Sequence, residues 1–238
     1  MRIAFVMGEY PGAEFERRAE KARSYSGPDL DVDVLKVGVS PYRGLMTPME
    51  VQMAAPLFIE AYRRAEREGY DAAVPLGFLD LGVEGGRSAV DIPIVGALQA
   101  SLRVADLLGD RFGFIVYRDE SIGPARARVQ AYGMADRISG FQSSKMKMTQ
   151  YAEAPGALEE NFLTAARSLI DSGADVIIPA GVSQCPVHLD PRWLTAELGI
   201  PVVDGFGAPI HMAASLARLG LAQSRIRHPR SEPPESGA

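Results

Sequence analysis

Short apolar segments alternate with amphipathic segments along most of the chain. The first apolar segment is RIAFVM at 2–7, and DVDVLKV at 31–37 alternates acidic and apolar residues as a sheet strand does. Residues 48–68 have helical composition, and Gly69 follows as a helix stop. Further strands are predicted at 70–78, 92–96, 111–117, 174–181 and 200–206, and further helices at 97–109, 123–134, 157–173, 191–199 and 209–220. This alternation predicts an α/β fold with parallel sheets and helices on both faces.

A repeated segment indicates that the fold has two similar parts. EREGYDAAVPLGF at 66–78 and IDSGADVIIPAGV at 170–182 share Gly-x-Asp, a strand, Pro, one residue and Gly. An Ile-Pro strand follows each copy. We therefore expect two Rossmann-like half-domains related by a pseudo-twofold axis, with Gly77 and Gly181 facing each other across a cleft at the carboxyl ends of the strands. Two unrelated βα units of this type would also look somewhat alike.

The predicted division follows this repeat. The first half-domain comprises residues 1–98 plus 202–222, and the second comprises residues 99–201. Residues 223–238, QSRIRHPRSEPPESGA, combine proline, serine and charge with few apolar residues, so they are predicted to be a disordered tail that includes His228.

Composition narrows the class of partner. The 238 residues carry a net charge of −5, and no run of basic residues is present. Both features argue against a surface that binds nucleic acid. No apolar run approaches the roughly 20 residues of a membrane span, and no signal peptide is predicted. A single cysteine excludes an intrachain disulfide and fits a reducing cytoplasm. We expect a cytoplasmic protein that acts on a small molecule. No nucleotide-binding motif is present.

Several stretches resemble one enzyme family. EREGYDAAVPLGFLDLGVEGGRSAVDIPIVG, SGADVIIPAG and LGIPVVDGFGAPIHMAASLARLGL resemble the aspartate/glutamate racemase superfamily, closest to its hydantoin racemase branch, and the resemblance covers most of residues 1–222. It implies two half-domains that each place a cysteine at a strand end, where the two thiols act as acid and base on opposite faces of a carbon next to a carbonyl or carboxylate. It also implies a homo-oligomer.

The chain departs from this pattern at both cysteines. Gly77 and Gly181 stand at those positions, so two-thiol racemisation is not expected. One-thiol decarboxylation, known in related enzymes, also lacks its cysteine. Cys185 lies four residues further on, about 6 Å away in a helix and up to about 13 Å in an extended chain, so it replaces the thiol only if the turn is remodelled.

The segment around Cys185 has two interpretations. Cys185-x-x-His188, followed by Asp190, has the composition of half a metal site or of a thiol with its base. The alternative, which we favour, is a buried cysteine in a helix-capping turn. His211 lies at helical spacing among apolar residues and is expected to be packed and hydrogen-bonded.

Polar residues at other predicted strand ends are candidates for the site. Where hydantoin racemases have Asn-Pro-Asn after the first strand, this chain has Gly8-Glu9-Tyr10; Glu9 is a candidate base, and Tyr10 is expected to contact substrate. Tyr117 is a candidate proton carrier, and Arg118 is a candidate clamp for a carboxylate. Each also has an ordinary surface interpretation.

The remaining candidates lie in loops around the predicted cleft. Arg43 is in a loop that the family folds over the cleft, and Asp80 matches an acidic family position but also suits a helix cap. The turns after the two repeated strands are expected to contact substrate through Gly77, Phe78, Gly181, Val182 and Ser183.

Three functions are consistent with these residues. The first is a cofactor-independent isomerase or lyase acting on a carbon next to a carboxylate or carbonyl, in which Glu9, Tyr117, His188 or Cys185 moves protons; its substrate is predicted to be a small carboxylate or cyclic amide. The second is a divalent-metal-dependent hydrolase or lyase with Glu9, Asp80 and His188 as ligands. The third is a non-catalytic protein that binds a small acid. We prefer an enzyme because polar residues gather at the predicted strand ends.

Overall fold

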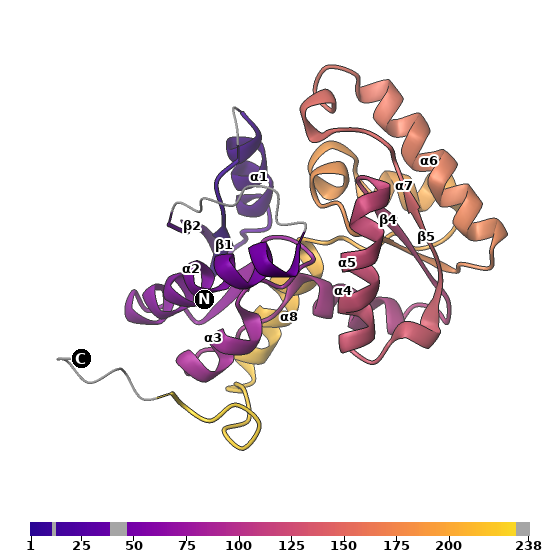
Figure 1. The fold of residues 1–238 in the computed structure, drawn as a ribbon. Helices are drawn as coiled ribbons and strands as arrows, with labels where there is room; N and C mark the ends of the chain where they lie inside the picture. The colour runs from indigo at the N-terminus through magenta and orange to yellow at the C-terminus, as the bar shows by residue number, and fades with distance from the viewer. Residues whose placement is uncertain (11–12, 39–46, 232–238) are drawn as a thin grey trace.

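The protein consists of two α/β halves that lie side by side (Figure 1). The structure is a computed structural model, and it describes residues 1–10, 13–38 and 47–231. The first part of the chain forms β1 (Arg2–Met7), α1 (Glu14–Arg23), β2 (Asp31–Lys36), α2 (Pro48–Arg67), β3 (Ala72–Pro75) and α3 (Val83–Ala89). The second part forms α4 (Ala97–Asp106), β4 (Phe112–Val116), α5 (Ile122–Ala131), β5 (Ile138–Ser143), α6 (Pro155–Asp171), β6 (Val176–Pro179), α7 (Pro191–Leu198) and α8 (Gly207–Arg218).

The two sheets have the same topology. Their strand orders are β2-β1-β3 and β5-β4-β6, and all pairs are parallel. In each sheet the strand that comes first in the sequence lies in the centre, namely β1 in one sheet and β4 in the other. The two strands that follow it along the chain flank it on either side. One further parallel bridge extends each sheet, from Ala73 to Ile94 and from Ile177 to Val202. The predicted α/β fold class with two similar halves is therefore confirmed.

The structure differs from the predicted elements in two respects. The strands expected at 92–96 and 200–206 are reduced to the single bridges, because Pro93 and Pro201 have no N–H to donate to a ladder. Helices α1 and α3 and strand β5 were not predicted. α1 is rich in charged residues, and β5 has a glycine and is only half-buried for most of its length, so neither shows a continuous apolar pattern.

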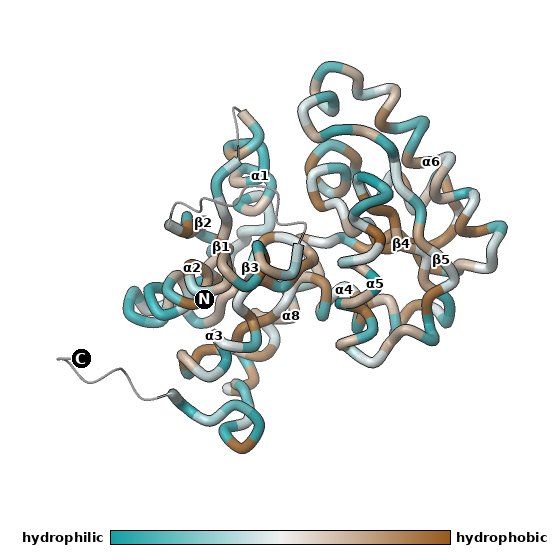
Figure 2. The backbone as a smooth tube through the Cα atoms, in the orientation of Figure 1, coloured by the Kyte–Doolittle hydropathy of each residue, from teal (hydrophilic) through white to brown (hydrophobic). Residues whose placement is uncertain are grey.

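Both faces of each sheet are covered by helices. Along β1, Ile3 and Phe5 pack against α1 and α8, whereas Ala4 and Val6 pack against α2, because side chains alternate between the two faces of a strand. The second sheet lies between α6 on one face and α4 and α5 on the other. Figure 2 shows the apolar character of β4 between these helices. Helix α8, the last helix along the chain, packs against β1 and β3 of the first sheet.

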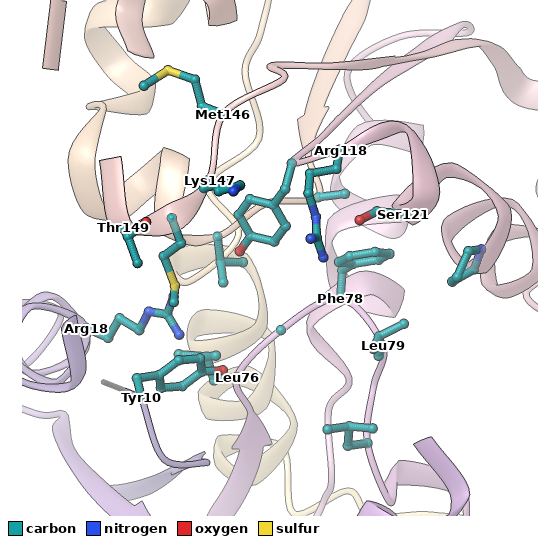
Figure 3. Close-up of a pocket in the computed structure, with 17 residues that line it drawn as sticks. Tyr10, Arg18, Leu76, Phe78, Leu79, Arg118, Ser121, Met146, Lys147 and Thr149 are labelled. Atoms are coloured by element: carbon teal, nitrogen blue, oxygen red, sulfur yellow. The ribbon is translucent and has the colours of Figure 1, made fainter. Parts of the chain in front are cut away.

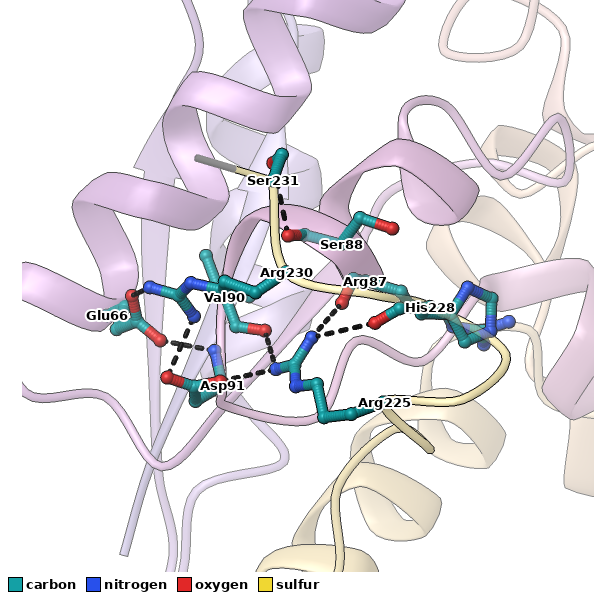
Figure 4. Close-up of polar contacts among 9 residues, drawn as sticks. All are labelled: Glu66, Arg87, Ser88, Val90, Asp91, Arg225, His228, Arg230 and Ser231. Atoms are coloured by element: carbon teal, nitrogen blue, oxygen red, sulfur yellow. Dashed lines mark hydrogen bonds and ion pairs between the residues drawn. The ribbon is translucent and has the colours of Figure 1, made fainter. Parts of the chain in front are cut away.

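The segment after α8 lies against the first half (Figure 4). Arg225 donates to the carbonyl oxygens of Arg87, Val90 and His228 and pairs with Asp91. Further along, the backbone of Ser231 donates to the carbonyl of Ser88 at 2.9 Å. The predicted tail, 223–238, thus includes described residues, up to 231, that contact α3 and the loop after it.

The predicted boundaries of the halves, 1–98 plus 202–222 and 99–201, stay a prediction that limited proteolysis can check. No helix in the described part of the chain combines the length and apolar character needed to cross a bilayer.

Candidate active site

A cleft of about 400 Å³ lies where the carboxyl ends of strands from both sheets meet (Figure 3). Tyr10 follows β1, Gly77 follows β3, Tyr117 follows β4, and Val182 follows β6. The full lining consists of Tyr10, Arg18, Leu76, Gly77, Phe78, Leu79, Leu81, Tyr117, Arg118, Ser121, Pro124, Met146, Lys147, Met148, Thr149, Ala180 and Val182. Such strand ends are the usual location of sites in open parallel sheets, so this cleft is the candidate active site.

Three cations line the cleft, and no carboxylate does among the residues that the structure describes. Arg18 comes from α1, Arg118 follows β4, and Lys147 precedes the 3₁₀ turn Met148–Gln150. Arg118 and Lys147 are exposed and form no ion pair within the described residues. In Figure 3 the guanidinium of Arg118 points toward the ring of Phe78. The cleft therefore attracts anions.

Tyr117 occupies the position next to the second glycine of the repeat. A Cβ atom on Gly181 would lie 2.7 Å from Cε1 of Tyr117, closer than side chains can approach. The Tyr117 hydroxyl accepts a hydrogen bond from the backbone N–H of Ser183 at 3.3 Å, and its ring stacks on Tyr151. The ring thus fills the space that a side chain at Gly181 would need, and it brings a phenol to the cleft.

The surroundings of Gly77 are different. A Cβ atom at Gly77 would meet nothing within 4 Å, but its φ of +98° is a conformation that other residues rarely adopt. The cleft beside it has an apolar wall formed by Leu76, Phe78, Leu79 and Leu81. Within residues 1–10, 13–38 and 47–231 no phenol contacts this glycine, so the two repeated strand ends differ in the side chains around them.

Tyr10 and Arg18 stack on each other at the edge of the cleft. The guanidinium carbon of Arg18 lies 3.4 Å from the centre of the Tyr10 ring. Burial raises the pKa of Tyr10, and the positive charge of Arg18 only partly opposes this effect. Tyr10 is therefore a neutral phenol near pH 7, able to donate a hydrogen bond but not to act as a base.

Cys185 lies outside the cleft. Its side chain is fully buried in the hydrophobic core of the second half, within the irregular helical turn η4 (Ser183–His188). Burial raises the pKa of its thiol well above the ordinary value, and Asp204 and Asp190 add to the shift. A buried, protonated thiol is a core residue, in agreement with the interpretation favoured from the sequence.

Asp80 is also buried, and it caps a helix. Its carboxylate accepts hydrogen bonds from the backbone N–H groups of Leu98 and Gln99 at the start of α4 and from the hydroxyl of Tyr132 at 2.6 Å. Burial raises the pKa of Asp80 despite these bonds. Asp80 thus connects β3 to α4 and is not part of the lining.

The proposed metal ligands do not come together. The carboxylate of Glu9 pairs with Lys36 at 3.0 Å, Asp80 caps α4, and Nε2 of His188 lies 3.2 Å from Glu14. In the described part of the chain no group of three or more His, Cys, Asp and Glu side chains is placed to hold a metal ion. The described structure therefore does not bring Glu9, Asp80 and His188 together as a ligand set.

The structure brings together six of the predicted site residues in the lining, namely Tyr10, Gly77, Phe78, Tyr117, Arg118 and Val182. Gly181 and Ser183 adjoin the lining through Tyr117. Glu9, Cys185, His188 and Asp80 are not among the lining residues. Arg43 lies outside the described residues. His211 is exposed on α8, with its ring edge-on to Tyr25.

Sequence reasoning missed Arg18, Ser121 and Lys147. Arg18 is placed by the spacing of α1, where Arg18, Ala19 and Ala22 form the buried face of an otherwise polar helix. The i, i+1, i+4 spacing of these residues is typical of the buried face of a helix. Because arginine is rarely buried, the sequence alone does not assign Arg18 to that face. Lys147 lies in an irregular segment, and no local pattern indicates that it reaches the cleft.

Comparisons with known proteins agree with this architecture. Residues 15–213 match the family model described as Asp/Glu/Hydantoin racemase. A hydantoin racemase from Pseudomonas sp. (strain NS671) is 27% identical over 201 residues, which cover 82% of this chain and 79% of the relative. The crystal structure of allantoin racemase from Pseudomonas fluorescens is similar over 100% of both chains, with a TM-score of 0.83 and 25% identity. A variant of arylmalonate decarboxylase is similar in fold over 92% of this chain and 94% of its own, with a TM-score of 0.62 and 18% identity.

Proposed function

Since the chain belongs to the Asp/Glu/hydantoin racemase family, we propose that it is a cofactor-independent lyase that removes a carboxyl group from a small carboxylic acid and protonates the product from one face. The named homologues are hydantoin and allantoin racemases, which supports the prediction that the chain is an enzyme. The choice of a lyase within the broader class of isomerases and lyases rests on the lining of the cleft.

One observation carries this choice. The lining contains two phenols and three cations but no Asp, Glu, His or Cys among the described residues. Racemisation requires a base that removes a proton from carbon and an acid on the opposite face that returns one. Decarboxylation requires only a proton donor, because the electrons left on carbon come from the broken carbon–carbon bond.

The residues fit such a reaction in a defined way. The bond between the α-carbon and one carboxylate breaks, CO₂ leaves, and the electron pair stays on the α-carbon as an enediolate of the remaining carboxylate. Arg118 and Lys147 stabilise that negative charge. The Tyr117 hydroxyl then donates its proton to the α-carbon, and the phenolate takes a proton from water.

The shape of the cleft supports a substrate with one apolar substituent. Leu76, Phe78, Leu79 and Leu81 give the cleft an apolar wall beside Gly77, and the guanidinium of Arg118 points toward the Phe78 ring of this wall (Figure 3). A volume of about 400 Å³ is within the range of small-molecule sites. We therefore propose α-substituted malonates as the class to assay first. The arylmalonate decarboxylase neighbour shares the fold, and its name is consistent with this class.

The experiment is turnover in deuterated water with a panel of α-substituted malonates. We expect release of CO₂ and one deuterium on the α-carbon of a product enriched in one enantiomer. Tyr117→Phe should slow product formation by about 10²- to 10⁴-fold and reduce the enantiomeric excess of the product. Recovered malonate without product, for every compound that stabilises the protein against heat, would contradict the lyase and favour a protein that only binds.

A hydantoin-type racemase is the second candidate, favoured by the 27% identical relative. It predicts a different result in the same solvent, namely loss of optical rotation of a single-enantiomer hydantoin or allantoin together with deuterium exchange into the substrate. A homo-oligomer and a cytoplasmic location remain proposals that rest on the family resemblance and on the single cysteine.

A further inference from the structure

Arg18 is one of the largest fully buried side chains of the protein, although it carries a charge. Only 1% of its surface is exposed. Burying a guanidinium is costly unless its N–H groups are satisfied, so its partners determine where it can lie.

The partners of Arg18 come from both halves. Nε donates to Oε1 of Glu14, one turn earlier on α1, at 3.2 Å. From the second half, Oγ of Ser183 and Sδ of Met148 accept from Nη2. The guanidinium is therefore held on one edge by its own helix and at Nη2 by the opposite half.

His188 completes the contact from the second half. Its Nε2 lies 3.2 Å from Oε2 of Glu14, so the two carboxylate oxygens of Glu14 bind Arg18 and His188 separately. The side chains of Glu14 and His188 are only 11% and 9% exposed. Burial disfavours ionised Glu14, but the contacts with His188 and Arg18 outweigh it, and the pKa of Glu14 lies below its ordinary value. An exposed i,i+4 ion pair contributes little to stability, whereas the Glu14–Arg18 pair is shielded from water.

One nitrogen of Arg18 remains for a ligand. The bonds of Arg18 to Glu14, Met148 and Ser183 use Nε and Nη2, and its guanidinium lines the cleft beside the ring of Tyr10. A guanidinium held at Nε and Nη2 is oriented to donate through Nη1 to one oxygen of a carboxylate.

We propose that Glu14 and His188 are positioning residues that hold Arg18 in the cleft from the two halves, so that this anion-binding group is in place only when the halves are in contact. The inference rests on the proposed function for its ligand, a carboxylate. The positioning itself depends only on Arg18, Glu14 and His188.

The experiment measures how fast phenylglyoxal modifies Arg18 in the intact protein, read by peptide mass spectrometry with Arg103, which is exposed and outside the cleft lining, as the internal reference. Glu14→Leu should raise the Arg18 rate about tenfold, the usual worth of a hydrogen bond to a charged group. His188→Leu should raise it in the same direction. Glu14→Gln keeps an acceptor at the same place and should restore a rate near that of the unsubstituted protein.

The matched control is Glu16→Leu, which changes an exposed glutamate in the same turn of α1 and should leave the rate unchanged. Thermal unfolding of each variant shows whether it folds. If Glu14→Leu does not fold, the comparison of His188→Leu with the unsubstituted protein decides. An unchanged Arg18 rate in folded Glu14→Leu or His188→Leu would overturn the proposal, and so would a Glu14→Gln rate as high as that of Glu14→Leu.

Added malonate separates this inference from the proposed function. If malonate slows modification of Arg18 and Arg118 in the unsubstituted protein, both residues face the bound anion. If malonate has no effect while Glu14→Leu still accelerates the reaction, the positioning holds and the anionic substrate is wrong.

Discussion

The ring of Tyr117 lies against Gly181 so closely that a Cβ on Gly181 would be 2.7 Å from Tyr117 Cε1. The family resemblance seen in the sequence implies a cysteine at this position, and here a phenol that follows the neighbouring strand fills the space that a side chain would need. The absence of a side chain at residue 181 and the position of the Tyr117 ring are therefore two parts of one packing arrangement.

This arrangement predicts that the lost side chain cannot simply be restored. Gly181→Ala should lower the free energy of unfolding by about 1–3 kcal/mol, because the added methyl group overlaps the Tyr117 ring. In a Tyr117→Ser background, Gly181→Ala should lower the free energy of unfolding by less. Urea unfolding of the unsubstituted protein, the two single variants and the double variant measures this difference. Gly8→Ala is the control, since nothing lies within 4 Å of its Cβ position. Equal costs in both backgrounds would refute the packing argument.

Removing only the Tyr117 hydroxyl should separate activity from stability. Tyr117→Phe should reduce kcat by about 10²- to 10⁴-fold, as expected for loss of a proton donor. Its free energy of unfolding should fall by only about 1 kcal/mol, because a single hydrogen bond, to the N–H of Ser183, is lost. Tyr70→Phe, which removes a hydroxyl bonded to Asp33 away from the cleft, should leave kcat unchanged. Full activity of Tyr117→Phe would assign the proton transfer to another group.

The two exposed cations of the cleft should govern substrate affinity. Arg118→Ala and Lys147→Ala should each raise KM roughly ten- to a hundredfold, since each removes a charge-assisted contact with the carboxylate. Lys145→Asn is the control, because it removes a nearby charge outside the lining and asparagine tolerates the positive φ of this residue. Steady-state kinetics with the best malonate measures the effect. An unchanged KM in both alanine variants would place the anion elsewhere.

The contact of Glu14 with Arg18 and His188 should make stability depend on acid. The pKa of Glu14 is lower in the folded protein than its ordinary value of 4.5, so its ionised form stabilises the fold above pH 4.5. This contribution is lost as the pH falls below 4.5 toward the lowered pKa. The stability difference between the unsubstituted protein and Glu14→Gln should therefore shrink in that range, measured by urea unfolding at several pH values. Glu16→Gln should show no such change, and a difference that grows on acidification would reverse the assigned sign.

The segment after α8 should stabilise the first half. Arg225→Ala should lower the free energy of unfolding by about 1–2 kcal/mol, because it removes bonds to the carbonyls of Arg87 and Val90 and to Asp91. Arg227→Ala is the control: its pair with Glu84 is exposed and should contribute at most about 1 kcal/mol. Equal losses of stability in the two variants, measured by thermal unfolding, would show that the bonds of Arg225 do not account for the stabilising effect of residues 223–231.

Much of the site was predictable because its residues follow strands. Tyr10, Gly77, Tyr117 and Arg118 stand directly after or within a few residues of apolar segments, and parallel strands place such residues at one edge of a sheet. Glu9 occupies the same kind of position, but a strand end does not determine which way a side chain points. In the fold, Glu9 turns to Lys36 on β2, outside the cleft lining.

The sequence by itself determined the α/β class and the repeated topology, because hydrophobic periodicity is a local property of the chain. Only the tertiary structure decided that Tyr117 fills the space at Gly181, that Cys185 is a core residue and that Arg18 is a buried cation of the cleft. These facts depend on contacts between segments far apart in the sequence: Arg18 and Ser183 are 165 residues apart, yet they are hydrogen-bonded. Burial and hydrogen-bond partners set the chemistry of each group, and both arise only when segments far apart in the sequence pack together.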